Sequence, residues 1–147
     1  MSGGYTKSEV EAAILAALFP LSVGGGGNVR ILETYKGEFS AAGVMPEALQ
    51  TPSIFLAYAS STFRPGPYLY VEETMSFNVI AACRSGGPSD ALEVLTGVRD
   101  RLCGSTLGLD VSPIRLLRVS SLYSDREMEL YAALYTLTQK VRPALQG

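Results

Sequence analysis

The first periodic run of apolar residues follows a helix-start signal. Thr6-Lys7-Ser8-Glu9 has the form of a capping box, in which the first and fourth side chains satisfy backbone N–H groups that a helix leaves free. The apolar side chains that follow share one helical face, and Pro20 interrupts the pattern. The sequence therefore predicts a helix from about Lys7 to Phe19.

A second helical pattern lies in the middle of the chain. Ser89 or Asp90 provides a cap for its start, and Gly104 follows its last periodic residue. We therefore expect a helix from this cap to about Cys103. Its predicted buried stripe consists of Leu92, Leu95, Val98 and Leu102.

Alternation of apolar and polar residues predicts strands. The clearest one runs from Tyr70 to Cys83, and Glu73 is the exception on its otherwise apolar face. A strand at 53–60 precedes it and is apolar on both faces, which is typical of a central strand. The two prolines of the intervening segment, 61–67, indicate a loop without regular pairing.

Two further strands are expected after the second helix, at 114–123 and 127–141, with a turn at 124–126. The predicted inner face of the last strand consists of Met128, Leu130, Ala132 and Leu134, with Tyr131 and Tyr135 on the other side. A weaker strand pattern covers 29–35. Pro46 favours one or two helical turns at 45–50.

This order of elements predicts an α+β protein with a mainly antiparallel sheet of about four strands, covered by helices on one face. Residues 1–147 are expected to form one domain, which suits a chain of this length. The side chains expected to be largely buried are Ile14, Leu18, Met75, Phe77, Val79, Leu92, Leu95, Leu102, Leu130 and Leu134.

Composition and charge narrow the classes of partner. Apolar residues make up 47% and charged residues 18% of the chain, which is typical of a folded domain. The net charge is −2 and the 12 basic residues are scattered, so no patch for sequence-specific nucleic-acid binding is expected. No apolar stretch is long enough to span a bilayer, and we expect neither a signal peptide nor a membrane partner.

The residue types that most catalytic sites need are scarce. The chain has no histidine, so a Ser-His-Asp or Cys-His arrangement cannot form. Glu127 and Glu129 share a strand face beside a turn, where solvated carboxylates are far commoner than an acid–base pair. Cys83 and Cys103 are expected to be buried, reduced thiols. The glycine run Gly24 to Gly27 lacks the Lys and Ser/Thr of a phosphate loop, which favours a flexible connector. We therefore expect no enzyme activity, metal, nucleotide or prosthetic group.

Tyr68, Tyr70, Tyr123, Tyr131 and Tyr135 all lie in or beside the two expected hairpins. One explanation of this enrichment is the high propensity of tyrosine for strands. The other is a protein–protein interface, because tyrosine is common in interfaces. The expected outer sheet face carries Ile80, Ala82, Tyr131, Ala133 and Tyr135, which is too apolar for a wholly solvated surface. The candidate interface residues are Phe63, Arg64, Tyr68, Tyr70, Glu72, Glu73, Tyr131 and Tyr135.

Five sequence phrases, spread from about Ser8 to Thr138, occur in a characteristic order. They are EVEAAILAAL at 9–18, YKGEF at 35–39, PSIFLAY at 52–58, FNVIAACR at 77–84, and LGL followed by PIRLLRV between 107 and 119. In this order the phrases resemble a family of small proteins encoded among the tail genes of Mu-like phages and prophages. The fold of that family is similar to that of phage tail terminators.

This resemblance implies a structural role in a virion. A tail terminator forms a ring, commonly a hexamer, that caps the head-proximal end of the tail tube, stops its polymerisation and offers a surface for head docking. The implied partners are other copies of the chain, the tail tube protein and the head–tail connector or neck protein. DNA passes through such a ring without sequence-specific contact. Assembly would take place in the host cytoplasm.

Two other interpretations stay open at this point. A head-completion or other neck protein would have a similar size. A small-molecule-binding regulatory α+β domain would be favoured by a pocket lined with convergent polar groups. The oligomeric state and the structure of the polar sites discriminate between these alternatives.

Overall fold

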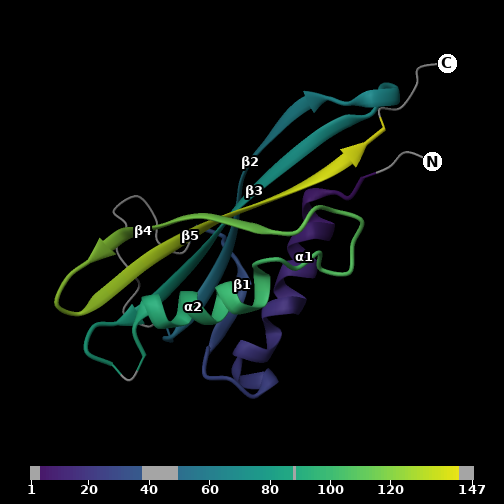
Figure 1. Ribbon diagram of the computed structural model, residues 1–147. Coiled ribbons are helices and arrows are strands. Elements are labelled where there is room, and N and C mark those ends of the chain that lie inside the picture. The colour runs from purple at the N-terminus through teal and green to yellow at the C-terminus, as the bar shows by residue number, and fades with distance from the viewer. Residues whose placement is uncertain (1–3, 38–49, 88, 143–147) are drawn as a thin grey trace.

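The computed structural model describes residues 4–37, 50–87 and 89–142 (Figure 1). The helices and strands in these ranges are α1 Lys7–Leu18, β1 Ile31–Thr34, β2 Ser53–Pro65, β3 Val71–Arg84, α2 Ala91–Leu102, β4 Arg115–Ser124 and β5 Met128–Val141. Three short 3-10 turns accompany them: η1 Phe19–Leu21, η2 Val23–Gly25 and η3 Pro67–Leu69. The helical turns expected at 45–50 lie almost wholly outside the described residues.

The strands form one sheet in the order β1-β2-β3-β5-β4. All neighbouring strands are antiparallel except β1 and β2, which pair in parallel. The expectation of an α+β fold with a mainly antiparallel sheet is confirmed, and the expected number of about four strands is corrected to five. The fifth strand is β1, which covers β2 only from Ser53 to Leu56.

Side-chain caps fix the starts of both helices. The capping box of α1 is present, with Glu9 N donating to Thr6 Oγ1 at 3.1 Å and Thr6 N to Glu9 Oε1 at 2.9 Å. At α2, Asp90 accepts a bond from Glu93 N at 2.7 Å, and Glu129 of β5 accepts one from Ala91 N at 2.8 Å. Glu129, expected at a solvated strand end, therefore helps to dock α2 on the sheet.

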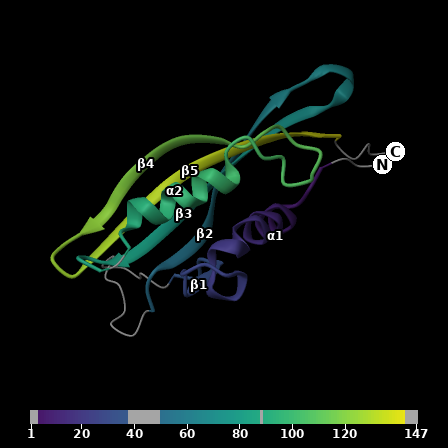
Figure 2. The same ribbon diagram turned by 60° about the horizontal axis from the view of Figure 1, so that its bottom comes forward.

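The two helices pack against one cluster of buried residues but over different strands (Figure 2). α1 contacts β1 and β2, whereas α2 contacts β3 and β5. β4 makes its extensive contacts with β5 alone. The helices therefore cover the face less completely than the sequence analysis expected, and β4 and the outer end of the β2–β3 hairpin extend beyond them.

A second buried cluster lies on the face away from the helices and consists of Phe55, Ile80, Ala82, Met128, Leu130 and Ala132. The prediction had assigned the two faces of β5 the wrong way round. Ile80 lies opposite Ala132, so Leu130 and Ala132 share the face of Ile80. Tyr135 instead belongs to the cluster under the helices. Both sets of alternate residues on β5 are apolar, so alternation alone could not decide between them.

Most of the predicted core residues are buried, and Leu92 and Leu134 are the two exceptions. Leu92 is 49% exposed, because the buried stripe of α2 consists of Ala91, Val94, Leu95, Val98 and Leu102. Leu92 follows Ala91 and therefore lies about 100° away around the helix. Leu134 is only partly buried, and Leu130 is buried in the second cluster.

The segment 61–67 was predicted to be an unpaired loop, and this was wrong. β2 continues to Pro65, which lies opposite Val71 of β3. Proline lacks an N–H donor, but β1 does not reach this part of β2, and no other strand in the described ranges pairs with its outer side. A proline is tolerated in such an edge position.

The glycine run forms a compact turn and not a loose connector. Gly25 N and Gly27 N both donate to Ser22 O, at 2.9 and 2.8 Å. A Cβ atom on Gly27 would lie 2.1 Å from Leu21 O, and one on Gly25 would lie 2.3 Å from Phe19 O. Gly25 and Gly27 are therefore required by the close approach of the backbone, and Gly26 is favoured by its φ of 95°.

Both cysteines are free thiols, but only Cys83 is buried, so the expectation for Cys103 was wrong. Burial, with Glu129, Asp90 and Glu93 nearby, raises the pKa of Cys83 to about 12. At about pH 8 we expect a thiol reagent to modify Cys103 quickly and Cys83 only after unfolding, because the thiolate is the reactive form. Counting modified thiols by mass spectrometry checks this. Rapid modification of both thiols in the folded protein would contradict it.

Candidate assembly interface

The outer part of the β2–β3 hairpin, residues 60–76, is here named the arm. Its strands pair from Ser60 opposite Ser76 to Pro65 opposite Val71, and the end of β5 continues the sheet beside it. The arm projects past both helices, and its tip lies at the opposite end of the molecule from the β4–β5 turn (Figure 1). It thus offers a surface that the core does not need.

The tip of the arm presents large side chains on an unusual backbone. Tyr68 has φ 57° and Leu69 has φ 67°, in the left-handed region that residues with a Cβ rarely adopt. Each such residue costs about 1–2 kcal/mol. Tyr68 is 90% exposed and Leu69 is 69% exposed, so burial within the chain does not offset this cost. Strain of this kind together with exposed apolar surface is typical of contact sites.

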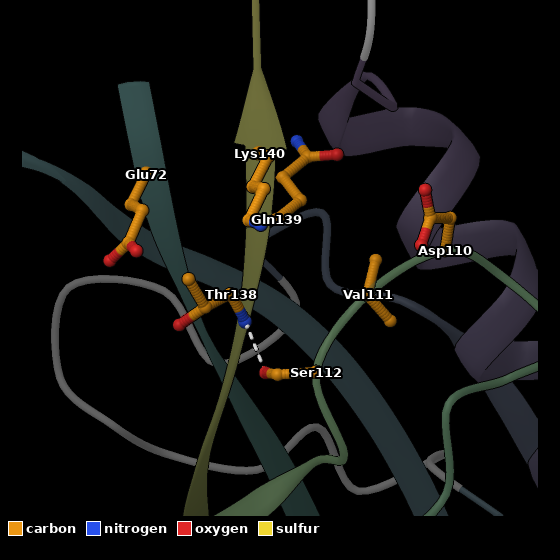
Figure 3. A pocket seen from close by; sticks show the side chains of 7 residues that line it. All are labelled: Glu72, Asp110, Val111, Ser112, Thr138, Gln139 and Lys140. Atoms are coloured by element: carbon orange, nitrogen blue, oxygen red, sulfur yellow. Dashed lines mark hydrogen bonds between the residues drawn. The ribbon is translucent and has the colours of Figure 1, made fainter. Parts of the chain in front are cut away.

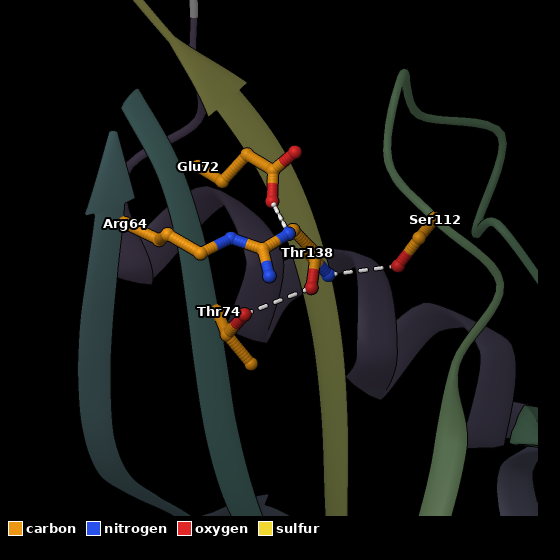
Figure 4. A network of polar contacts seen from close by, with 5 residues as sticks. All are labelled: Arg64, Glu72, Thr74, Ser112 and Thr138. Carbon is orange, nitrogen blue, oxygen red and sulfur yellow. Dashed lines mark hydrogen bonds and ion pairs between the residues drawn. The ribbon is translucent and has the colours of Figure 1, made fainter. Parts of the chain in front are cut away.

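Polar contacts link the two strands of the arm to each other and, through β5, to the segment before β4 (Figure 4). Arg64 of β2 forms an ion pair with Glu72 of β3. The hydroxyls of Thr74 and Thr138 lie 2.9 Å apart, and Thr138 N donates to Ser112 Oγ at 2.8 Å. Because these groups are exposed or partly exposed, they add little stability, and their effect is to hold the strands in register.

A pocket of about 420 Å³ opens next to this network (Figure 3). It is lined by Glu72, Asp110, Val111, Ser112, Thr138, Gln139 and Lys140. Several of its polar groups already have partners: Ser112 Oγ accepts from Thr138 N, Gln139 bonds to Tyr5 and Glu73, and Glu72 pairs with Arg64. Among the described residues, no three His, Cys, Asp or Glu side chains come together in a way that could hold a metal ion.

The most buried polar group beside the pocket is Gln139, which is 2% exposed. Its Oε1 accepts from Tyr5 N at 2.7 Å, and its Nε2 donates to Tyr5 O and to Glu73 Oε1, both at 2.9 Å. Tyr5 OH in turn accepts a bond from Asp110 N at 3.0 Å. Gln139 therefore joins the start of the chain to the arm. No sequence pattern indicated this role, because a polar residue at a strand end normally faces solvent.

Replacing Gln139 with Ala is expected to lower the free energy of unfolding by about 1–3 kcal/mol, because its partly buried partners, Tyr5 and Glu73, lose their hydrogen bonds. Urea unfolding followed by circular dichroism measures the change. The exposed Thr96→Ala on α2 is the control and should shift stability by less than about 0.5 kcal/mol. Equal stability of Gln139→Ala and the wild type would contradict the role of this side chain.

Six of the eight candidate interface residues lie on the arm, namely Phe63, Arg64, Tyr68, Tyr70, Glu72 and Glu73. Glu72 and Glu73 are held there by Arg64 and Gln139. The other two candidates do not lie on an outer face. Tyr131 packs against the cluster under the helices, and Tyr135 is 2% exposed within it. Burial raises the pKa of the Tyr135 hydroxyl above its usual value.

Sequence analysis missed a second exposed apolar region, on β4. Leu117, Val119 and Leu122 are 52%, 43% and 53% exposed. Leu117 and Leu122 fall at two register shifts between β4 and β5, so each is an extra residue that the ladder leaves unpaired. The sequence contains a signal for this region: Leu117 and Leu122 interrupt the alternation of apolar and polar residues that is strict in β3.

Comparison with known proteins bears on the fold. No protein-family model matches the chain, and no curated protein matches it. Among solved structures, it is similar to a chain of the virion of a native gene transfer agent particle, with a TM-score of 0.61 and 13% identity. The match covers 95% of this chain and 100% of the other. The two chains share a fold.

The same comparison covers both the helices and the sheet, so the likeness is to the whole architecture.

In the part of the chain that the structure describes, neither helix has the length and apolar character needed to cross a bilayer.

Proposed function

We propose that this protein is a structural component of a phage-type virion. The observation that carries the proposal is the full-length likeness of its fold to a chain of a gene transfer agent virion. Two further features support it: large apolar side chains lie exposed on the arm and β4, and the sequence lacks the histidine on which most acid–base sites depend. A role in assembly needs such surfaces, and an enzyme activity is not part of the proposal.

Within the virion, we propose that the protein is the tail terminator. Copies of the chain form a ring, of six subunits in the usual case, on the last ring of the tail tube. The ring covers the surface on which more tube subunits would add, so elongation stops. Its other side then binds the head–tail connector or neck protein. The Mu-like sequence phrases support this finer assignment.

Such a ring requires at least four contact patches on each subunit: one for the tube, one for the connector and two different ones for its neighbours in the ring. The arm is suited to one of these surfaces, because it is braced by the Arg64–Glu72 pair and presents Phe63, which is 64% exposed. DNA passes through the lumen, and the net charge of −2 is compatible with passage without tight binding.

Deletion of the gene from the phage or prophage that carries it tests the proposal. We expect tails of uncontrolled length that fail to join heads, and we expect a plasmid-borne wild-type gene to restore normal particles. Electron microscopy of the lysate measures tail length and attachment. Normal-length tails joined to filled heads would overturn the proposal. Normal-length tails that stay unattached would indicate a neck protein instead of a terminator.

A further inference from the structure

We propose that neighbouring copies join by continuing the sheet: β4 of one copy pairs, antiparallel, with the arm portion of β2 of the next copy. This inference rests on the ring of the proposed function and names the surfaces that close it. It draws on the two open sheet edges, on where the exposed apolar side chains lie, and on the directions of the strands.

Both edges of the sheet have free backbone groups. β4 is the last strand of the sheet, and its outer side pairs with no other strand among the described residues. β1 covers the outer side of β2 only up to Leu56, where Tyr35 N donates the final bond. From Ser60 to Pro65, no strand of the described residues pairs with the outer side of β2. Each edge carries the row of donors and acceptors that a further strand needs.

The exposed large apolar side chains concentrate on these two edges. Phe63, Tyr68 and Leu69 lie on the arm, and Leu117, Val119 and Leu122 lie on β4. Elsewhere in the described part of the chain, only Phe19, Val23 and Leu92 are large, apolar and exposed. Apolar cross-strand pairs stabilise a sheet, so the two edges complement each other in side chains as well as in backbone.

The strand directions make this contact head-to-tail. β4 runs opposite to β5, β5 opposite to β3, and β3 opposite to β2, so β4 also runs opposite to β2. A second copy in the same orientation can therefore add its β2 to β4 in the favoured antiparallel manner. One copy uses its β4 and the other its arm, which is the kind of contact that generates a closed ring.

The two open edges lie at different positions along the strand direction. The start of β4, Arg115, lies level with Thr136 and hence with Ser60, where the arm begins. β1 pairs with the first residues of β2, so a neighbour's β4 can pair only with the arm part of β2. The neighbouring copy must therefore be displaced along the strand direction. Closing a sheet on itself requires such a stagger between strands.

Features of β4 restrict which strand it accepts. The register shifts at Leu117 and Leu122 bend the edge, and Arg115 and Arg118 are exposed on it. Bulges and edge charges disfavour indiscriminate pairing. The partner strand must therefore fit a bent edge that carries two arginines.

Cross-linking between engineered cysteines tests the contact. In a Cys103→Ser background, Thr62→Cys on the arm and Ser120→Cys on β4 are combined in one chain, and a short bis-maleimide is added. Both positions are exposed and lie on the sheet face away from the helices, so the apolar contacts stay intact. We expect a ladder of covalent multimers that ends at one fixed size. The matched control combines Thr62→Cys with Thr96→Cys on α2 and should give almost no product.

Chains with one engineered cysteine establish the direction of the contact. A mixture of Thr62→Cys and Ser120→Cys copies should give covalent dimers, whereas either variant alone should stay monomeric. Dimers from Ser120→Cys alone would mean a symmetric β4–β4 contact and would overturn the proposal. Absence of a ladder in the double variant at high protein concentration, or an equal ladder in the α2 control, would also overturn it.

The failure of this inference and that of the proposed function are distinguishable in the phage. Leu117→Glu with Val119→Glu places two carboxylates on the β4 edge, and we expect it to reproduce the long, unattached tails of the deletion. The control, Leu92→Glu, changes an equally exposed leucine on α2. If the deletion gives long tails but the β4 variant, expressed at wild-type level, gives normal ones, the ring uses other surfaces and the terminator role stands.

Discussion

Phe55→Ala is expected to lower the free energy of unfolding by about 3–5 kcal/mol, among the largest effects of any single substitution in this chain. Phe55 is fully buried in the cluster on the sheet face away from the helices, and its ring lies edge-to-face with Tyr35 at 6.3 Å between centroids. Truncation removes this contact and leaves a cavity that the rigid sheet can fill only in part. Urea unfolding followed by far-ultraviolet circular dichroism measures the change.

Phe63→Ala is the matched control, because the same substitution is made on the same strand. Phe63 is 64% exposed, so its truncation should change the stability of the monomer by less than about 0.5 kcal/mol. The comparison tests whether the sheet is buried on both faces. A small effect of Phe55→Ala, close to that of Phe63→Ala, would show that the second cluster contributes little to the fold.

The elements that the sequence predicted well are those in which one local signal was decisive. β3 alternates between apolar residues and residues such as Thr74, Ser76 and Asn78, so both its existence and its inner face could be assigned. The start of α1 is encoded by a four-residue capping box whose hydrogen bonds form within those residues. Such signals need no information about distant parts of the chain.

The errors arose where the outcome depends on a distant partner. β5 is apolar at both sets of alternate positions, and its faces are decided by its register with β3. Pro65 joins a ladder because β1 stops short of it, which the residues around Pro65 do not reveal. Gln139 is buried because the segment at Tyr5 folds over it from the other end of the chain.

The same distinction applies to the candidate interface. The arm could be named as a candidate contact surface, because its aromatic residues cluster within a few positions, although its two prolines led to the wrong prediction of an unpaired loop. The β4 edge could not, because its exposure follows from β5 lying between β3 and β4. A strand of the same sequence in the centre of the sheet would have buried Val119. The order of strands, more than local composition, decides which apolar residues are available for assembly.

Leu95→Ala is expected to lower the free energy of unfolding by about 2–5 kcal/mol. Leu95 is 3% exposed in the stripe by which α2 packs on the sheet, between Val94 and Val98 in the cluster under the helices. Alanine has high helix propensity, so the loss reflects packing and not the helix itself. The substitution therefore measures how much the α2–sheet contact stabilises the fold.

Leu92→Ala on the same helix provides the control. Sequence periodicity placed both leucines in the buried stripe, whereas the structure leaves Leu92 49% exposed. Alanine slightly favours the helix, so we expect a change below about 0.5 kcal/mol, measured in the same urea titration. If the two variants lose equal stability, α2 is rotated about its axis relative to the structure described above. If only Leu95→Ala is destabilised, α2 packs on the sheet with the face that buries Leu95 and leaves Leu92 exposed.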